Sequence, residues 1–155
     1  MPSLVELRDA AIRELGLLLP DVTVGAISGG ADAAEVLRES LGPATVLVTI
    51  LSAQNTAPAD SFDLDVYGRF AAIVVMYGGT GQEEREMDGL VVVDEVVQAI
   101  HGQMFGLADT SFAQIRSIAP LDDEELERKG AWAWAVLWEQ AFTLTPPAEN
   151  PDESV

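Results

Sequence analysis

The chain has 155 residues, of which 26 are acidic and 8 are basic, so its formal net charge is −18. This length fits one domain, and a hydrophobic content of 48% supports a real core. The charge excludes a protein that wraps nucleic acid by neutralising phosphates, and the lack of cysteine excludes disulfides, cysteine-ligated zinc and thiol chemistry.

The N-terminal half predicts an amphipathic helix followed by shorter elements. Residues 3–19 carry a helical stripe of apolar side chains, begin with a capping box of Ser3 and Glu6, and end at Pro20. Charges inside the apolar pattern argue against a signal peptide, and no apolar run approaches the roughly 20 residues of a membrane span. The next segments predict a short strand, a short helix, a buried strand and a loop: residues 22–27, 32–41, 44–51 and 52–60.

The middle of the chain predicts a long strand, a polar loop and a helix. Residues 62–77 read as a strand whose two faces are both apolar near its end, which is typical of a central strand. Residues 78–89, GGTGQEEREMDG, predict a second long polar loop. A helix is expected over 90–104 with Asp88 as its cap, although its valines leave a strand over 90–93 as an alternative.

The C-terminal part predicts two more strands. Residues 112–118 form the first, and the acidic run 122–130 forms a loop or a helical turn. In the last strand, large and small side chains alternate with a period of two, which predicts one face buried in the core and a second face that another backbone or a subunit could approach. The large side chains are Trp132, Trp134, Val136, Trp138, Phe142 and Leu144.

These elements predict an α+β fold. Its sheet is mostly antiparallel and is packed by the N-terminal helix and the central helix. Residues 1–146 are expected to form a single domain, with Trp132, Trp134, Trp138 and Phe142 in its core. Residues 147–155 are rich in proline and acidic side chains and are expected to be a disordered tail.

The sequence predicts no catalytic residue, no cofactor and no metal site. His101 is the single histidine, and it is interpreted as a helix-face side chain near a helix C-terminus. The acidic residues that could join it in a metal site, or assist it as a general base, are Asp94, Glu95 and Asp109. The run 122–127 lacks the alternating oxygen ligands and the glycine of a calcium loop. Gln82 and Glu83 stand where a phosphate loop needs lysine and a hydroxyl.

Three segments of the chain resemble small tail-completion proteins of long-tailed phages, and most of all the Mu-like tail terminator family. They are RFAAIVVMYGG at 69–79, GQMFGLAD at 102–109 and FAQIRSIAPLDDEELERKGAWAWAVLWEQAFTL at 112–144. Members of this family open with an amphipathic helix and close with an aromatic-rich strand, as residues 3–19 and 132–144 do here. Residues 27–42 have no counterpart in the family pattern.

The resemblance implies a non-enzymatic virion protein, assembled in the host cytoplasm. Tail terminators form a ring, usually a hexamer, at the head-proximal end of the tail. The ring stops polymerisation of the tube, and of the sheath in contractile tails, and docks the neck. The implied partners are therefore other copies of the chain, tube and possibly sheath proteins, and neck or head-completion proteins. DNA would pass without specific binding, because an acidic lumen repels it.

Candidate subunit-interface or channel-lining residues are the charged side chains of the predicted polar loops. They are Asp60, Glu83, Glu84, Arg85, Glu86, Asp88, Asp122, Asp123 and Glu124. Such loops suit a ring because they are polar alone and become ordered against a neighbour.

Two other functions are open at this point. One is a neck or head-completion adaptor, which is also a small ring protein. The other is an acidic monomer that binds a basic partner, although its carboxylates are scattered rather than spaced like the phosphates of a nucleic acid. An enzyme would require His101 or the acidic segments to converge in one cleft.

Overall fold

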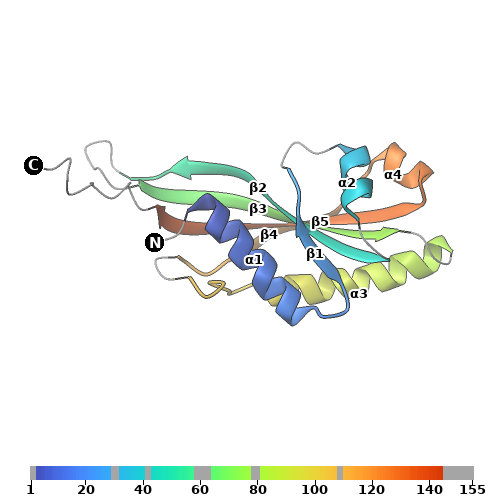
Figure 1. Cartoon of the computed structure of the whole chain (residues 1–155), viewed down its shortest axis with the longest axis horizontal. Coiled ribbons are helices and arrows are strands. Elements are labelled where there is room, and N and C mark those ends of the chain that lie inside the picture. The colour runs from blue at the N-terminus through green and yellow to red at the C-terminus, as the bar shows by residue number, and fades with distance from the viewer. Residues whose placement is uncertain are drawn as a thin grey trace, which may run out of the picture.

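The computed structural model describes residues 3–28, 32–40, 43–57, 64–77, 81–107 and 110–144. Across these residues the chain folds as α+β, with four helices and one mixed five-stranded sheet (Figure 1). The elements in chain order are α1 Leu4–Leu18, β1 Thr23–Ala26, α2 Ala33–Glu39, β2 Ala44–Asn55, β3 Leu64–Tyr77, α3 Gln82–Ile100, β4 Gln114–Pro120, α4 Glu124–Arg128 and β5 Ala131–Leu144.

The sheet has the strand order β1-β2-β3-β5-β4. β1 runs parallel to β2, whereas β2–β3, β3–β5 and β5–β4 are antiparallel pairs. β3 and β5 stay in one register over 14 residues each, from Leu64 opposite Leu144 to Tyr77 opposite Ala131. The predicted α+β class and the mostly antiparallel pairing are therefore correct, and β3 is the central strand that its apolar faces indicate.

The main core lies between the sheet and the helices α1 and α3. Ser3 caps α1 by accepting a hydrogen bond from the Glu6 amide at 3.1 Å, and the helix buries an apolar stripe that includes Leu15. From the sheet side, Trp138 stacks on Phe70 with ring centroids 5.3 Å apart. Each large apolar side chain buried in this way contributes about 1.5–3 kcal/mol.

A second, smaller layer covers the other face of the sheet at one end only. α2 and α4 lie side by side there, on the side opposite α1 and α3 (Figure 1). Leu126 of α4 packs in one cluster with Ala131 and Ala133 of β5. The small residues of β5 are thus approached, at this end, by a helix of the same chain, because alanine leaves room for it.

The prediction for residues 82–104 needs correction. α3 begins at Gln82, so most of the predicted loop 78–89 is helix, Asp88 lies inside that helix, and no strand forms over 90–93. Glutamine, glutamate, arginine and methionine are good helix formers, and the two glutamates of the first turn favour the positive end of the helix dipole. Leu90 is 41% exposed, because Val93, Val96 and Ile100 form the buried stripe of this helix.

Smaller differences concern the strand ends, and some predictions fall outside the described residues. β2 continues through the predicted loop 52–60 as far as Asn55, after a bulge between Ile50 and Ser52. The acidic run forms the short helix α4. Asp60, Asp109 and the predicted tail 147–155 lie outside the described residues. None of the described helices is long and apolar enough to cross a membrane.

Candidate functional site

The structure brings two of the predicted acidic segments to one end of the molecule. The first turns of α3 carry Glu83, Glu84, Glu86 and Asp88, all exposed. The chain before α4 lies at the same end (Figure 1). There Asp122 and Glu124 are exposed, whereas Asp123 accepts hydrogen bonds from the amides of Glu125 at 2.8 Å and Leu126 at 3.3 Å and so caps α4. We call this region the acidic end.

A groove in the acidic end joins these segments to the aromatic strand. It has a volume of about 410 Å³ and opens where β4 ends beside β5. Side chains of α3, of the β4–α4 segment and of β5 line it, among them Arg85, Glu86, Asp122, Glu127, Trp132 and Trp134. We call it the tryptophan groove, because the indoles of its two tryptophans stack with centroids 5.9 Å apart.

The position of Trp132 explains a glycine in the middle of α3. A Cβ atom on Gly89 would lie 2.2 Å from the nearest carbon of the Trp132 indole, so only glycine lets the helix backbone pass this ring. Trp132 and Trp134 are half-buried, whereas Trp138 and Phe142 further along β5 are buried.

A second polar cluster lies on the sheet face opposite α1 and α3, beyond the part that α2 and α4 cover. Arg69 and Tyr67 of β3, Glu139 of β5 and Arg116 of β4 form it, and we call it the ion-pair strip. Glu139 Oε2 accepts hydrogen bonds from the Tyr67 hydroxyl at 2.5 Å and from Arg116 Nε at 2.7 Å. Arg116 Nη2 also donates to the Tyr67 hydroxyl at 3.1 Å and to Gln114 Oε1 at 2.9 Å. Arg69 Nε lies 3.7 Å from the second Glu139 oxygen.

Strand register positions these groups. Arg69 is directly opposite Glu139 in the β3–β5 ladder, and Gln114 of β4 faces Glu139 from the other side. Arg116 occupies the extra position of a bulge between Ile115 and Ser117, and a bulge re-aims a side chain.

The strip changes the acid–base properties of its members. The Tyr67 hydrogen bond, followed by the Arg116 and Arg69 guanidinium groups, lowers the pKa of the Glu139 carboxyl against the opposing effect of desolvation. The Tyr67 and Glu139 contacts raise the pKa of Arg116. Glu139 is therefore held as a carboxylate, and the exposed charges of the strip are the two guanidinium groups, whose side chains are 58% and 50% exposed.

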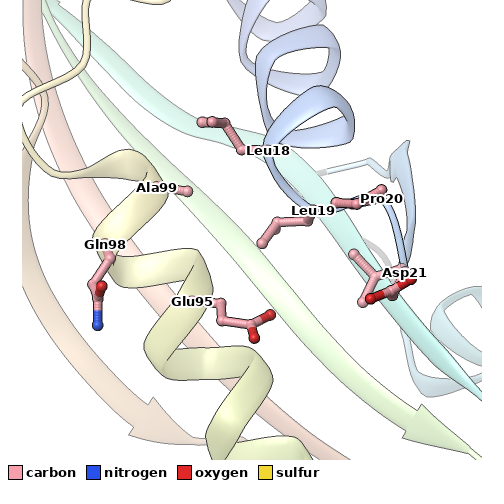
Figure 2. Close-up of a pocket in the computed structure, with 8 residues that line it drawn as sticks. Leu18, Leu19, Pro20, Asp21, Glu95, Gln98 and Ala99 are labelled. Carbon is pink, nitrogen blue, oxygen red and sulfur yellow. The ribbon is translucent and has the colours of Figure 1, made fainter.

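A further hollow of about 440 Å³ lies between the end of α1 and α3. Leucine side chains from α1 and the following turn line one side of it (Figure 2). Figure 2 shows the Glu95 carboxylate extending from α3 toward the turn that carries Asp21. The lining contains the two carboxylates of Asp21 and Glu95 and no histidine, serine or threonine.

Among the described residues, the acidic side chains considered as possible partners of His101 do not gather around it. His101 is the C-cap of α3, it is exposed, and its Nδ1 accepts the Ile115 amide hydrogen at a distance of 3.5 Å. Asp94 instead accepts a hydrogen bond from Gln98 one turn along α3. In the part of the chain that the structure describes, no three histidine, aspartate or glutamate side chains are grouped so as to hold a metal ion.

The ion-pair strip was not predicted from the sequence, although the sequence contains one signal for it. Glu139 is the single charged residue of β5 and lies on the face that carries small side chains. Tyr67 and Arg69 have the parity of β3 that faces the same side. A charge of this kind, placed among small side chains in a strand, indicates a partner on a neighbouring strand.

The chain matches no protein-family model, and none of the curated proteins matches its sequence.

Proposed function

We propose that this chain is a structural subunit of a phage tail, a tail terminator that forms a ring at the head-proximal end and stops tube polymerisation. The single observation that carries the proposal is the ion-pair strip. It is a polar surface on β3, β5 and β4, beyond the part of this sheet face that α2 and α4 cover. The resemblance of residues 69–79 and 112–144 to tail terminators supports the same function.

Charge complementarity supports a head-to-tail contact between copies. The strip presents the guanidinium groups of Arg69 and Arg116 on a protein with a net charge of −18. The acidic end of a neighbouring copy would offer the matching carboxylates. Two different surfaces that fit each other generate a closed ring when the rotation between copies closes. Complementary charges fix the register of such a contact and discourage wrong partners.

A free strand edge adjoins this surface and supports the same assembly. β1 pairs with β2 only from Thr45 to Val48. Among the described residues, no other strand borders the outer side of β2 from Ile50 to Asn55. An exposed strand edge is a template for pairing with another chain. A neighbour seated on the strip could therefore also cover this edge.

The net charge also fits a ring through which DNA passes. Carboxylates that are not used in contacts between copies would face solvent or the channel. A negative wall repels the DNA backbone, so the DNA moves without binding.

The proposal is tested by the native mass of the purified protein across a concentration series, with and without polymerised tail tubes. We expect a hexamer, or a monomer that becomes one on the tube. Arg69→Glu should shift the equilibrium toward the monomer, because it opposes the acidic end. Arg13→Glu is the matched control, since Arg13 is equally exposed on α1, away from the strip.

A chain that is monomeric at every concentration and does not cap tubes would contradict the proposal. Capture by a portal instead of a tube would favour the neck adaptor. An unchanged hexamer in Arg69→Glu would show that the strip is not the contact.

A further inference from the structure

We infer that the tryptophan groove binds a cationic side chain, an arginine or a lysine in an extended basic segment of a partner protein. The groove lies in the acidic end, so a basic segment bound there would take the place of a neighbouring copy's ion-pair strip, and experiment can separate these two occupants. Two tryptophans line the groove.

Trp132 and Trp134 are placed unlike the other aromatic side chains of β5. Trp138 and Phe142 lie on the same face of the strand and are 1% and 3% exposed. Trp132 and Trp134 are half-buried, and their indoles lie 5.9 Å apart at an interplanar angle of 21°. Their rings therefore offer aromatic surface to the groove instead of filling the core.

The helix α3 holds this aromatic surface in place. The Trp132 indole lies so close to Gly89 that a Cβ atom there would be 2.2–2.6 Å from three of its ring carbons. The Trp132 ring therefore lies against the α3 backbone at Gly89 and stacks on the Trp134 indole. A binding surface that is fixed before its ligand arrives loses less entropy when the ligand binds.

Charged groups around the indoles select the ligand. Glu86, Asp122 and Glu127 contribute three carboxylates to the lining and Arg85 one guanidinium, so the groove has a formal charge of 1 − 3 = −2. The Nε atom of Arg85 is buried, and this side chain is therefore part of the wall. A cation over the face of a tryptophan is attracted by the ring, and nearby carboxylates add to that attraction.

The same groups exclude other ligands of the groove. A phosphate or an acidic peptide would be repelled by the three carboxylates. A purely apolar segment would leave those carboxylates without a partner. Arginine is the better of the two cations, because its planar guanidinium stacks on an indole while it donates hydrogen bonds to carboxylates at its edge.

The test follows the indole N–H resonances of the full chain by NMR during titration with acetyl-Gly-Arg-Gly-Arg-Gly-amide. Trp132→Phe and Trp134→Phe assign the two groove signals, and the buried Trp138 provides an internal reference. We expect saturable shifts of the Trp132 and Trp134 signals, weakened by salt, and no shift of the Trp138 signal. The same peptide with citrulline in place of arginine has the same shape without the charge and should not bind.

Substitutions in the groove separate recognition from folding. The double substitution Glu86→Gln and Glu127→Gln changes exposed side chains and should weaken binding by roughly threefold to tenfold. Glu124→Gln is the matched control, because it removes one charge from α4 outside the groove and should leave the affinity unchanged.

Three results would overturn the inference. The first is the absence of a saturable shift at peptide concentrations up to about 10 mM, where even millimolar affinity is visible. The second is equal binding of the citrulline peptide, or equal affinity in the double variant and in Glu124→Gln. The third is a shift of the groove signals with protein concentration alone, which would assign the groove to a second copy of the chain.

Discussion

Replacing Gly89 by alanine tests how tightly α3 packs against the tryptophan groove. Gly89 is buried within the helix, and an added Cβ would lie 2.2, 2.5 and 2.6 Å from three carbons of the Trp132 indole. Atoms cannot remain at such distances. Either the helix backbone must move away from the sheet, or the indole must turn out of the position in which it stacks on Trp134.

The expected magnitude combines three effects. Replacing glycine by alanine in a helix interior raises the free energy of unfolding by about 1 kcal/mol. Overpacking costs about 1–3 kcal/mol, and an indole that turns outward gives up about 0.5–1.5 kcal/mol of aromatic stacking. We therefore expect Gly89→Ala to lower the free energy of unfolding by about 2 kcal/mol. For a domain of this length, that lowers the Tm by about 4–8 °C.

The assay is thermal unfolding followed by circular dichroism, with Gly16→Ala as the matched control. Gly16 lies in α1, and a Cβ atom there meets nothing within 4 Å, so this change should raise the Tm by about 2–4 °C. If Gly89→Ala is as stable as Gly16→Ala, the close packing of α3 on Trp132 is refuted.

Three further substitutions test other parts of the structure. The hydrogen bond from the Tyr67 hydroxyl, and after it the Arg116 guanidinium, lowers the pKa of Glu139 below its ordinary 4.5. The Glu139 carboxylate therefore stabilises the fold above pH 4.5, and this contribution is lost as the pH falls through the lower pKa of the folded state. Glu139→Gln should therefore lower the Tm at pH 7, with a deficit that shrinks as the pH falls below 4.5, and a Tm deficit that does not depend on pH would disprove the role of its charge. Gln140→Ala removes a buried amide that donates to the Ser111 carbonyl at 2.9 Å, and we expect a loss of about 1–3 kcal/mol in urea unfolding, whereas an unchanged midpoint would show that the bond contributes nothing. Leu126→Ala should lower the free energy of unfolding in urea by about 2–5 kcal/mol and expose α4 to proteolysis, because the Leu126 side chain is only 3% exposed. Resistance of α4 to protease would argue that Leu126 does not anchor this helix.

The sheet was predictable because its alternation is strong. In β5 the large side chains share one parity, and this parity faces α1 and α3 throughout the strand. The pattern does not determine how completely each position is covered. Trp138 packs against both Phe70 and Phe105, whereas Trp132 lines the open groove beside α3. This difference in burial depends on elements that are distant in the sequence.

The start of α3 was predicted too late in the chain. The polar residues 78–89 indicated a loop and Asp88 indicated a cap, so the helix was expected to begin at residue 90. Gly89 is required by the Trp132 ring, which the sequence places 43 positions later. The good helix formers over 82–87 were the better local signal.

The candidate sites were only partly predictable. The acidic segments were identified from their composition, but their meeting at one groove depends on how α3 and β5 pack together. The ion-pair strip combines residues from three strands. Arg116 lies at a bulge in β4, and no residue type in this segment predicts that bulge. Contacts of this kind follow from strand order and register rather than from spacing along the chain.

The uneven covering of the sheet by helices has a consequence for backbone dynamics. At the end covered by α2 and α4, strand residues such as Leu47 and Val75 are enclosed between two helical layers. At the other end, β2 from Leu51 to Asn55 is exposed. Amide hydrogens at the first end should exchange with solvent only on global unfolding, whereas those at the second should exchange through local opening. One end of the molecule can therefore adjust its strand twist to a neighbour at low cost while the other keeps its shape.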